Sequence, residues 1–139
     1  MPNFLKSRDV EYALQQDLAS ILTSYDVIAP PLPDDFPDDG LPLVVVERLG
    51  GSRTDLVVEE HDVSFDVYAD RWASAVDAAN TTLAVVTALA DMPEQASGVD
   101  WHDAQINALP YSNPDPDHED VPRVTFSAVV TCRPESIQV

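Results

Sequence analysis

The sequence SFDVYADRWASAVDAAN, residues 64–80, changes its periodicity in the middle. Apolar and polar residues alternate over residues 64–69, as in a strand that is covered on one face, and from Trp72 onward apolar residues recur every three to four positions. A strand therefore runs directly into a helix. Such junctions often carry a glycine-rich phosphate loop or a nucleophile, but this one reads Ala-Asp-Arg at residues 69–71.

Two segments have the periodicity of amphipathic helices. Residues 7–24 place one apolar stripe on a helix, with Ser7 or Asp9 as the candidate N-cap. A second helix is expected over residues 71–91, and Pro93 helps to end it. The expected buried stripes are Val10, Ala13, Leu14, Leu18, Ile21 and Leu22 in the first helix and Trp72, Val76, Ala79, Leu83, Val86 and Ala90 in the second, which exposes Asn80, Thr81 and Thr82.

Several other segments read as strands. Residues 43–49 form one, and the Gly-Gly pair that follows predicts a turn. Residues 54–69 form one long strand or two, with a bulge or break at residues 59–62, because the apolar parity slips there. A weaker strand lies within residues 97–111. The clearest strand, PRVTFSAVVTCRP, places on one face Val124, Phe126, Ala128, Val130 and Cys132.

The order of elements is thus helix, two or three strands, helix, two strands, which predicts an α+β two-layer domain. We expect the two amphipathic helices to pack on one face of a four- to five-stranded mixed or antiparallel sheet. With 139 residues, of which 45% are hydrophobic, the chain is expected to form a single domain over residues 1–139. Two acidic, proline-rich segments, at about residues 29–42 and 110–122, are expected to be loops.

Charge is the strongest compositional signal. The chain has 7 Lys and Arg against 25 Asp and Glu, a formal net charge of -18. A surface this acidic repels phosphate backbones and anionic lipids, so we expect no binding to nucleic acid or membrane through the overall field. No window approaches the unbroken apolar run of about 18 residues that a membrane span needs. The same acidity would also suit solubility alone, or a salty or GC-rich host.

The candidate chemistry is thin. The cluster Asp115, Asp117, His118, Glu119 and Asp120 lacks the glycine and the terminal glutamate of a calcium loop, so a solvated loop is expected there and no metal site. The carboxylate pairs in residues 34–39 lie in a proline-rich loop, where nothing in the sequence would raise a pKa for glycosidase chemistry.

The remaining candidates point the same way. His61 and His102 stand beside carboxylates, but in no spacing that a catalytic or zinc site requires, and both are expected at the surface. A G-x-S-x-G elbow and a phosphate loop are both absent from the sequence. Cys132, the single cysteine, is expected to be a buried, inert thiol. The residues therefore predict no enzyme, no catalytic residue, no cofactor and no metal.

Four segments together resemble the tail terminator (tail-completion) proteins of long, flexible-tailed bacteriophages (siphophages), and the resemblance spans most of residues 9–133. They are the first helix DVEYALQQDLASIL, the strand LPLVVVERLGG, the strand-to-helix segment VSFDVYADRWASAVDAANTTLAVVTAL and the closing strand RVTFSAVVTCR. All four are patterns of sheet, helix and turn and none is a catalytic fingerprint. Related head-tail joining proteins share a similar plan.

The resemblance implies a virion subunit that assembles, most often as a hexameric ring, on the head-proximal end of the tail tube after synthesis in the host cytoplasm. The ring would stop tube polymerisation and join tail to head, so its partners would be further copies of itself, the tail tube protein and head-tail connector proteins. DNA would pass through without specific binding, and the junction at residues 69–71 would be a packing hinge. The candidate channel or interface residues are Asp34, Asp35, Asp38, Asp39, Asp115, Asp117, Glu119 and Asp120.

Two alternatives remain open at this point. A head-tail connector or another minor virion protein of similar fold would differ in its place in the particle. A stand-alone cytoplasmic binding domain or an unrecognised hydrolase is the more distant alternative.

Overall fold

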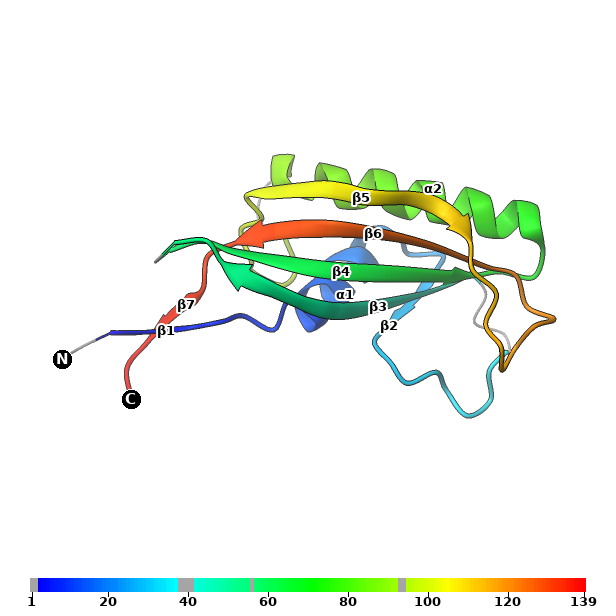
Figure 1. Ribbon diagram of the computed structural model, residues 1–139, viewed down its shortest axis with the longest axis horizontal. Coiled ribbons are helices and arrows are strands. Elements are labelled where there is room, and N and C mark those ends of the chain that lie inside the picture. Colours follow the sequence, from blue (N-terminus) through cyan, green and yellow to red (C-terminus); the bar gives the residue numbers. More distant parts are fainter. Residues whose placement is uncertain (1–2, 38–41, 56, 93–94) are drawn as a thin grey trace.

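The computed structural model describes residues 3–37, 42–55, 57–92 and 95–139. Two helices pack on a five-stranded mixed sheet, and a separate two-stranded sheet, which we call the ribbon, lies beside it (Figure 1). The α+β prediction is therefore confirmed. The elements are β1 (Phe4–Lys6), α1 (Val10–Ile21), β2 (Asp26–Ile28), β3 (Leu43–Arg53), β4 (Glu59–Tyr68), α2 (Trp72–Ala88), a short 3-10 turn η1 (Leu89–Asp91), β5 (Asp103–Ser112), β6 (Arg123–Cys132) and β7 (Glu135–Ile137).

The main sheet has the order β2-β3-β4-β6-β5, with β2 parallel to β3 and the other neighbours antiparallel. Both helices cover the same face, because their buried residues join those of the inward sheet face in one core. At its centre Phe65 of β4 stacks on Phe126 of β6, with ring centroids 4.6 Å apart. The predicted inward face of β6 is confirmed, since all five of its alternating residues, Cys132 included, are buried.

Helix α1 follows the prediction closely. It starts after the N-cap Asp9, whose carboxylate accepts a hydrogen bond from the Tyr12 backbone N–H at 3.1 Å. This bond satisfies one of the free N–H groups that every helix N-terminus exposes. The expected stripe is buried apart from Ile21, which is partly exposed, and Asp17 is buried with it.

The predicted face of α2 is confirmed at Ala79 and Val86, which are buried, and at Asn80 and Thr81, which are exposed, but it is wrong at Trp72, Val76 and Thr82. Trp72 is 46% exposed and Val76 is 37% exposed, whereas Thr82 is fully buried and donates its hydroxyl to the Ala78 carbonyl at 2.8 Å. The helix turns small residues toward the sheet, so its backbone can approach closely and the large side chains near its N-terminus are left outside. The residues of α2 that are buried are Ala75, Ala78, Ala79, Thr82 and Val86.

Helix α2 and η1 together form one helical stretch, residues 72–91, that is long and apolar enough to cross a membrane by length and composition alone, contrary to the expectation from the sequence. A core helix passes the same test. In this fold one face of α2 lies against β5 and β6, and the small residues of that face are buried, as in a core helix.

The expected turn at Gly50 and Gly51 is also wrong, because β3 continues through both glycines to Arg53. The strand changes register between Arg48 and Gly50. Gly50 has φ of 147°, a conformation that favours glycine, and a Cβ on Gly51 would collide with the Glu60 carbonyl oxygen. The glycines therefore accommodate an irregularity inside a long strand.

The expected break at residues 59–62 does not occur in β4, which pairs with β6 without interruption from Glu59 to Tyr68. The inward row of β4 keeps its period of two throughout, but two of its residues are polar. Glu59 and His61 are polar but continue the inward row of Val63, and both are buried. The sequence pattern had counted these two buried polar residues as a break.

Candidate functional site

Glu59 is a buried carboxylate at the start of β4, with 4% of its surface exposed. Its Oε2 atom accepts hydrogen bonds from the Ser7 hydroxyl at 2.7 Å and from Arg53 Nη2 and Nε at 2.7 Å and 2.9 Å. Burial alone would raise the pKa of Glu59, but the hydrogen bonds from Ser7 and Arg53 and the Arg53 charge outweigh it and lower the pKa. The carboxylate is therefore ionised and held from two sides.

His61, 1% exposed, lies next to Glu59 on the same face of β4. Its Nδ1 atom accepts a hydrogen bond from Arg48 Nε at 2.8 Å, which places the proton of the neutral ring on Nε2. Nε2 is 3.4 Å from Glu59 Oε1, a long contact that leaves both atoms without a well-formed hydrogen bond. Burial and the Arg48 charge lower the pKa of His61, so the ring is neutral at pH 7.

This network, Glu59, His61, Arg48, Arg53 and Ser7, does not have the geometry of a nucleophilic site. The Ser7 hydroxyl donates to a carboxylate that two arginine N–H groups already occupy, and the imidazole Nδ1 is taken by Arg48. A nucleophile needs a free base that is hydrogen-bonded to its hydroxyl. The arrangement is instead suited to fixing the backbone segments that carry these side chains.

The segment that the network fixes is the base of the ribbon formed by β1 and β7. Ser7 directly follows β1, and Arg53 Nη2 also donates to the Leu5 carbonyl at 3.3 Å. Arg8 Nε donates to the Arg133 carbonyl at 3.0 Å and so ties the segment after β1 to the segment before β7. The ion pair between the buried Glu59 and the exposed Arg53 thus positions the ribbon relative to the main sheet.

A second buried carboxylate, Asp115, lies at the opposite end of the molecule. It is 8% exposed and accepts hydrogen bonds from the Tyr68 hydroxyl at 2.9 Å and the Asp117 backbone N–H at 3.0 Å, with His118 Nδ1 at 3.1 Å. Burial opposes its charge, but the Asp117 N–H, His118 and Tyr68 together lower the pKa of Asp115. The expectation that this loop is solvated throughout is therefore wrong at Asp115.

The same network brings the two acidic loops together. The Phe36 ring packs edge-on against Tyr68 and His118, with centroids 4.8 Å away in each case. Burial raises the pKa of Tyr68 to about 12, so its hydroxyl remains a hydrogen-bond donor to Asp115. Residues 29–37 and 113–122, which we call the acidic loops, therefore share one end of the molecule.

The other candidate residues divide as follows. Asp34, Asp35, Asp117, Glu119 and Asp120 are exposed on the acidic loops, while Asp38 and Asp39 lie outside the described residues. Strand β5 extends to Ser112, so the second loop begins three residues later than expected. Of the histidines, His102 is exposed as predicted, but His61 is not.

The sequence analysis also missed an acidic surface on the face of the sheet that no helix covers. Register fixes which side chains share this face: Glu60 lies between Ser52 and Thr131, and Asp62 lies opposite Val129. At its Tyr68 end Arg123 Nη1 is 3.8 Å from Asp66. The carboxylates of this acidic sheet face are Glu47, Glu60, Asp62, Asp66 and Asp103. The period-two pattern of the strands carried this information.

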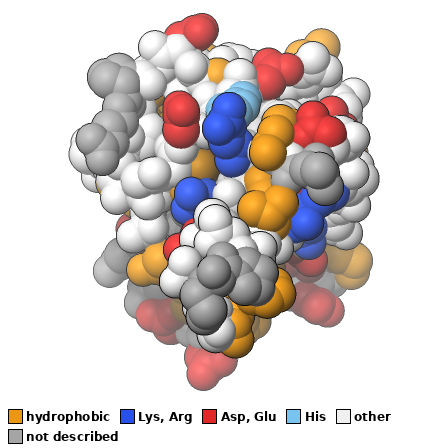
Figure 2. Space-filling view, turned by 90° about the vertical axis from the view of Figure 1, so that its left-hand side faces the viewer, with side chains coloured by type: hydrophobic (Ala, Val, Ile, Leu, Met, Phe, Trp, Pro, Cys, Tyr) orange, Lys and Arg blue, Asp and Glu red, His pale blue; other side chains and the backbone are white. Residues whose placement is uncertain are grey.

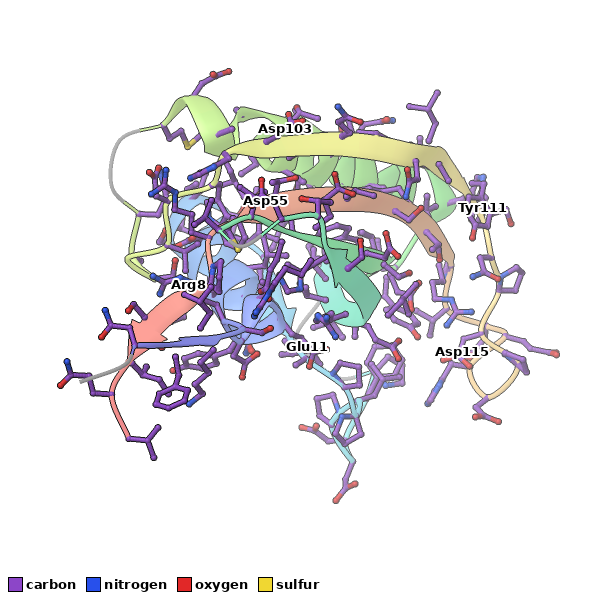
Figure 3. All side chains as sticks on the ribbon, turned by 60° about the vertical axis from the view of Figure 1, so that its left-hand side comes forward. Arg8, Glu11, Asp55, Asp103, Tyr111 and Asp115 are labelled. Atoms are coloured by element: carbon purple, nitrogen blue, oxygen red, sulfur yellow. The ribbon has the colours of Figure 1, made fainter. Side chains whose placement is uncertain are left out.

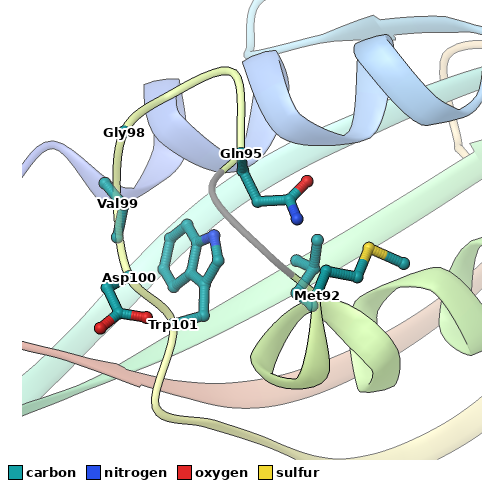
Figure 4. Close-up of a pocket in the computed structure, with 7 residues that line it drawn as sticks. Met92, Gln95, Gly98, Val99, Asp100 and Trp101 are labelled. Carbon is teal, nitrogen blue, oxygen red and sulfur yellow. The ribbon is translucent and has the colours of Figure 1, made fainter.

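Asp17 of α1 is a third buried carboxylate. Asp17 of α1 accepts hydrogen bonds from the Ser97 backbone N–H and hydroxyl, both at 2.7 Å, and from Trp101 Nε1 at 2.8 Å. Figure 4 shows Trp101 in the hollow formed by the residues around it, a cavity of about 350 Å³ that Met92 and Val99 also line. The hydrogen bonds to the Asp17 carboxylate all come from residues 97–101, so this side chain ties α1 to the segment that precedes β5.

Within the described part of the chain, no group of three or more His, Cys, Asp or Glu side chains is arranged to hold a metal ion. Cys132 is buried as predicted, and burial raises the pKa of its thiol to about 11. Such a thiol is a poor nucleophile near pH 7.

The chain matches no protein-family model, and a search of curated proteins finds no significant match.

Proposed function

We propose that this chain is a structural subunit of a bacteriophage tail, which forms a ring on the head-proximal end of the tail tube, ends tube polymerisation and offers a surface for joining tail to head. Two lines support the proposal: the resemblance of the four sequence segments to tail terminator proteins, and an α+β fold of the kind that this resemblance implies. The buried ionisable groups hold loops and the ribbon in place, so we propose that the function depends on the exposed surfaces.

The acidic sheet face is the observation that carries the proposal. Its carboxylates lie on three strands, β3, β4 and β5, each of ten or eleven residues. A strand of this length spans about 33 Å, nearly three times the roughly 12 Å width of the DNA major groove. Duplex DNA carries about one negative charge per 1.7 Å, so a wall of carboxylates repels it and lets it slide. In the proposed ring this face lines the channel.

Capping of tail tubes tests the proposal. Purified protein is mixed with isolated siphophage tail tubes and viewed by negative-stain electron microscopy. The expected result is a ring at one end of the tubes and an arrest of further growth when tube protein is added. Binding to head connectors without any binding to tubes would favour the head-tail connector instead, and binding to neither would refute both.

Reversal of charge on the acidic sheet face tests the channel assignment. Rings of Glu60→Lys/Asp62→Lys should retain duplex DNA at about 50 mM salt, because lysines in the channel hold phosphates, and should release it as salt rises. Matched control rings carry Asp70→Lys/Asp77→Lys, two exposed carboxylates near and on α2, away from this face. An electrophoretic mobility assay on assembled rings gives the readout. Equal DNA retention by the two variants would contradict the assignment.

A further inference from the structure

The ribbon has two features that are typical of a contact surface: it is a small, separate sheet, and it exposes apolar side chains. Its strands β1 and β7 have three residues each and pair with one another, apart from the main sheet. Phe4 is 48% exposed and Leu5 is 37% exposed. Two-stranded sheets on their own are marginally stable in water, and as consecutive strand residues Phe4 and Leu5 expose apolar surface on both faces of the ribbon.

The cations of the chain gather around this ribbon. Figure 2 shows Lys and Arg side chains beside hydrophobic ones on this end of the molecule. Lys6 lies in β1, and the hydrogen bonds of Arg8 and Arg53 tie both to the ribbon. Five of the seven Lys and Arg residues are in this region: Lys6, Arg8, Arg48, Arg53 and Arg133.

The acidic loops at the other end offer the complementary chemistry. Arg8 and Asp115 mark the two ends in Figure 3. The exposed carboxylates of these loops stand among prolines and beside the partly exposed Phe36, and the buried Asp115 network holds the loops in place. Within the ribbon Lys6 pairs with Glu135, but Arg8 and Arg133 beside it add cations, and Phe4 adds an exposed aromatic ring. These groups complement the exposed carboxylates and prolines of the acidic loops in charge and polarity.

We infer that the ribbon of one copy docks on the acidic loops of the next copy. The inference rests on the proposed function, because it names the contact that would build the ring. A ring with a rotation axis needs a head-to-tail contact between two different surfaces of each subunit. The ribbon and the acidic loops lie at opposite ends of one molecule (Figures 1 and 3), as this geometry requires.

Two charge-reversed chains test the contact. The ribbon variant carries Lys6→Glu/Arg133→Glu, and the loop variant carries Asp117→Lys/Asp120→Lys; all four positions are exposed, so both variants should fold. Each variant alone brings like charges together, and its assembly should need at least about tenfold more protein than the wild type. Mixed in equal amounts, the two variants should assemble again, because every contact in an alternating ring then joins opposite charges.

Sedimentation velocity measures assembly, and circular dichroism checks folding. Asp70→Lys/Asp77→Lys serves as the control: alone it should assemble as the wild type does, and mixed with the ribbon variant it should not restore closed rings, because the reversed ribbon still meets acidic loops. If the wild type forms rings and the two variants assemble as well as the wild type when alone, the docking inference is refuted while the proposed function stands. If the wild type forms no rings and does not bind tail tubes, the proposed function itself fails.

Discussion

Three buried carboxylates, Glu59, Asp115 and Asp17, organise the described structure, and each accepts hydrogen bonds from a segment distant in sequence. Ser7 and Glu59 are separated by 52 residues, and Ser97 and Asp17 by 80. A buried carboxylate is costly unless its hydrogen bonds are satisfied, so each one strongly specifies the segment that it holds. Each of these three carboxylates therefore positions a segment of the chain.

The lowered pKa of His61 predicts how the free energy of unfolding depends on pH. Burial and the Arg48 charge lower the pKa of His61 from 6.5 in the folded chain. As pH falls below about 6.5, His61 is therefore protonated in the unfolded chain but stays neutral in the folded chain. The free energy of unfolding should therefore begin to fall there. The pKa values of Glu59 and Asp115 are lowered from 4.5 and 3.8, so their contributions are present above these values and are lost as pH falls further.

Urea unfolding at pH 7.5, 6.5 and 5.5 measures the first of these steps. His61→Gln should reduce the loss of unfolding free energy over this range, because it removes the buried imidazole. His102→Gln, at an exposed histidine outside the network, is the control and should keep the wild-type dependence. The same pH dependence in His61→Gln and in the wild type would show that His61 does not titrate as described.

At the scale of elements, sequence patterns succeeded where periodicity and burial agree. Strand β6 alternates strictly, and its inward face was predicted residue by residue. Helix α2 has apolar or small residues on several sides, so more than one face could be buried. The prediction followed the large side chains, whereas in the structure mainly the alanines face the sheet. Glu59 and His61 were missed because a buried polar pair has the sequence pattern of a break.

The ribbon could not be predicted from sequence. Three residues give no period, and Phe4 pairs with Ile137, at the other end of the chain. The acidic sheet face was in principle visible, because alternate residues of each strand share a face. It became clear only when the register placed Glu60 and Asp62 of β4 beside Asp103 of β5, across β6.

Paired truncations test the two facings. Phe126→Ala removes a fully buried ring from the stack with Phe65 and should lower the free energy of unfolding by about 3 to 5 kcal/mol. Trp72→Ala removes a larger side chain that is 46% exposed, and should cost roughly 1 kcal/mol or less. Chemical unfolding of both variants gives the comparison. A larger loss for Trp72→Ala than for Phe126→Ala would contradict the faces described for α2 and β6.

At the scale of the whole molecule, charge opposes assembly. Each chain has a formal net charge of -18, so six copies would bring on the order of a hundred negative charges together. The contact that we propose between the ribbon and the acidic loops would act at short range, whereas this repulsion is long-ranged. The Debye length is about 30 Å at 0.01 M salt and about 8 Å at 0.15 M, so moderate salt screens the repulsion between bodies more than it weakens contacts at short range.

The most direct test of ring formation is sedimentation velocity of the wild-type protein at 0.01 M and 0.15 M salt over a range of protein concentrations. We predict monomer in dilute protein at the lower salt, and a discrete ring-sized species that grows with protein concentration and is favoured at the higher salt. A protein that sediments as a monomer under every one of these conditions, and that also leaves tail tubes uncapped, would contradict the account.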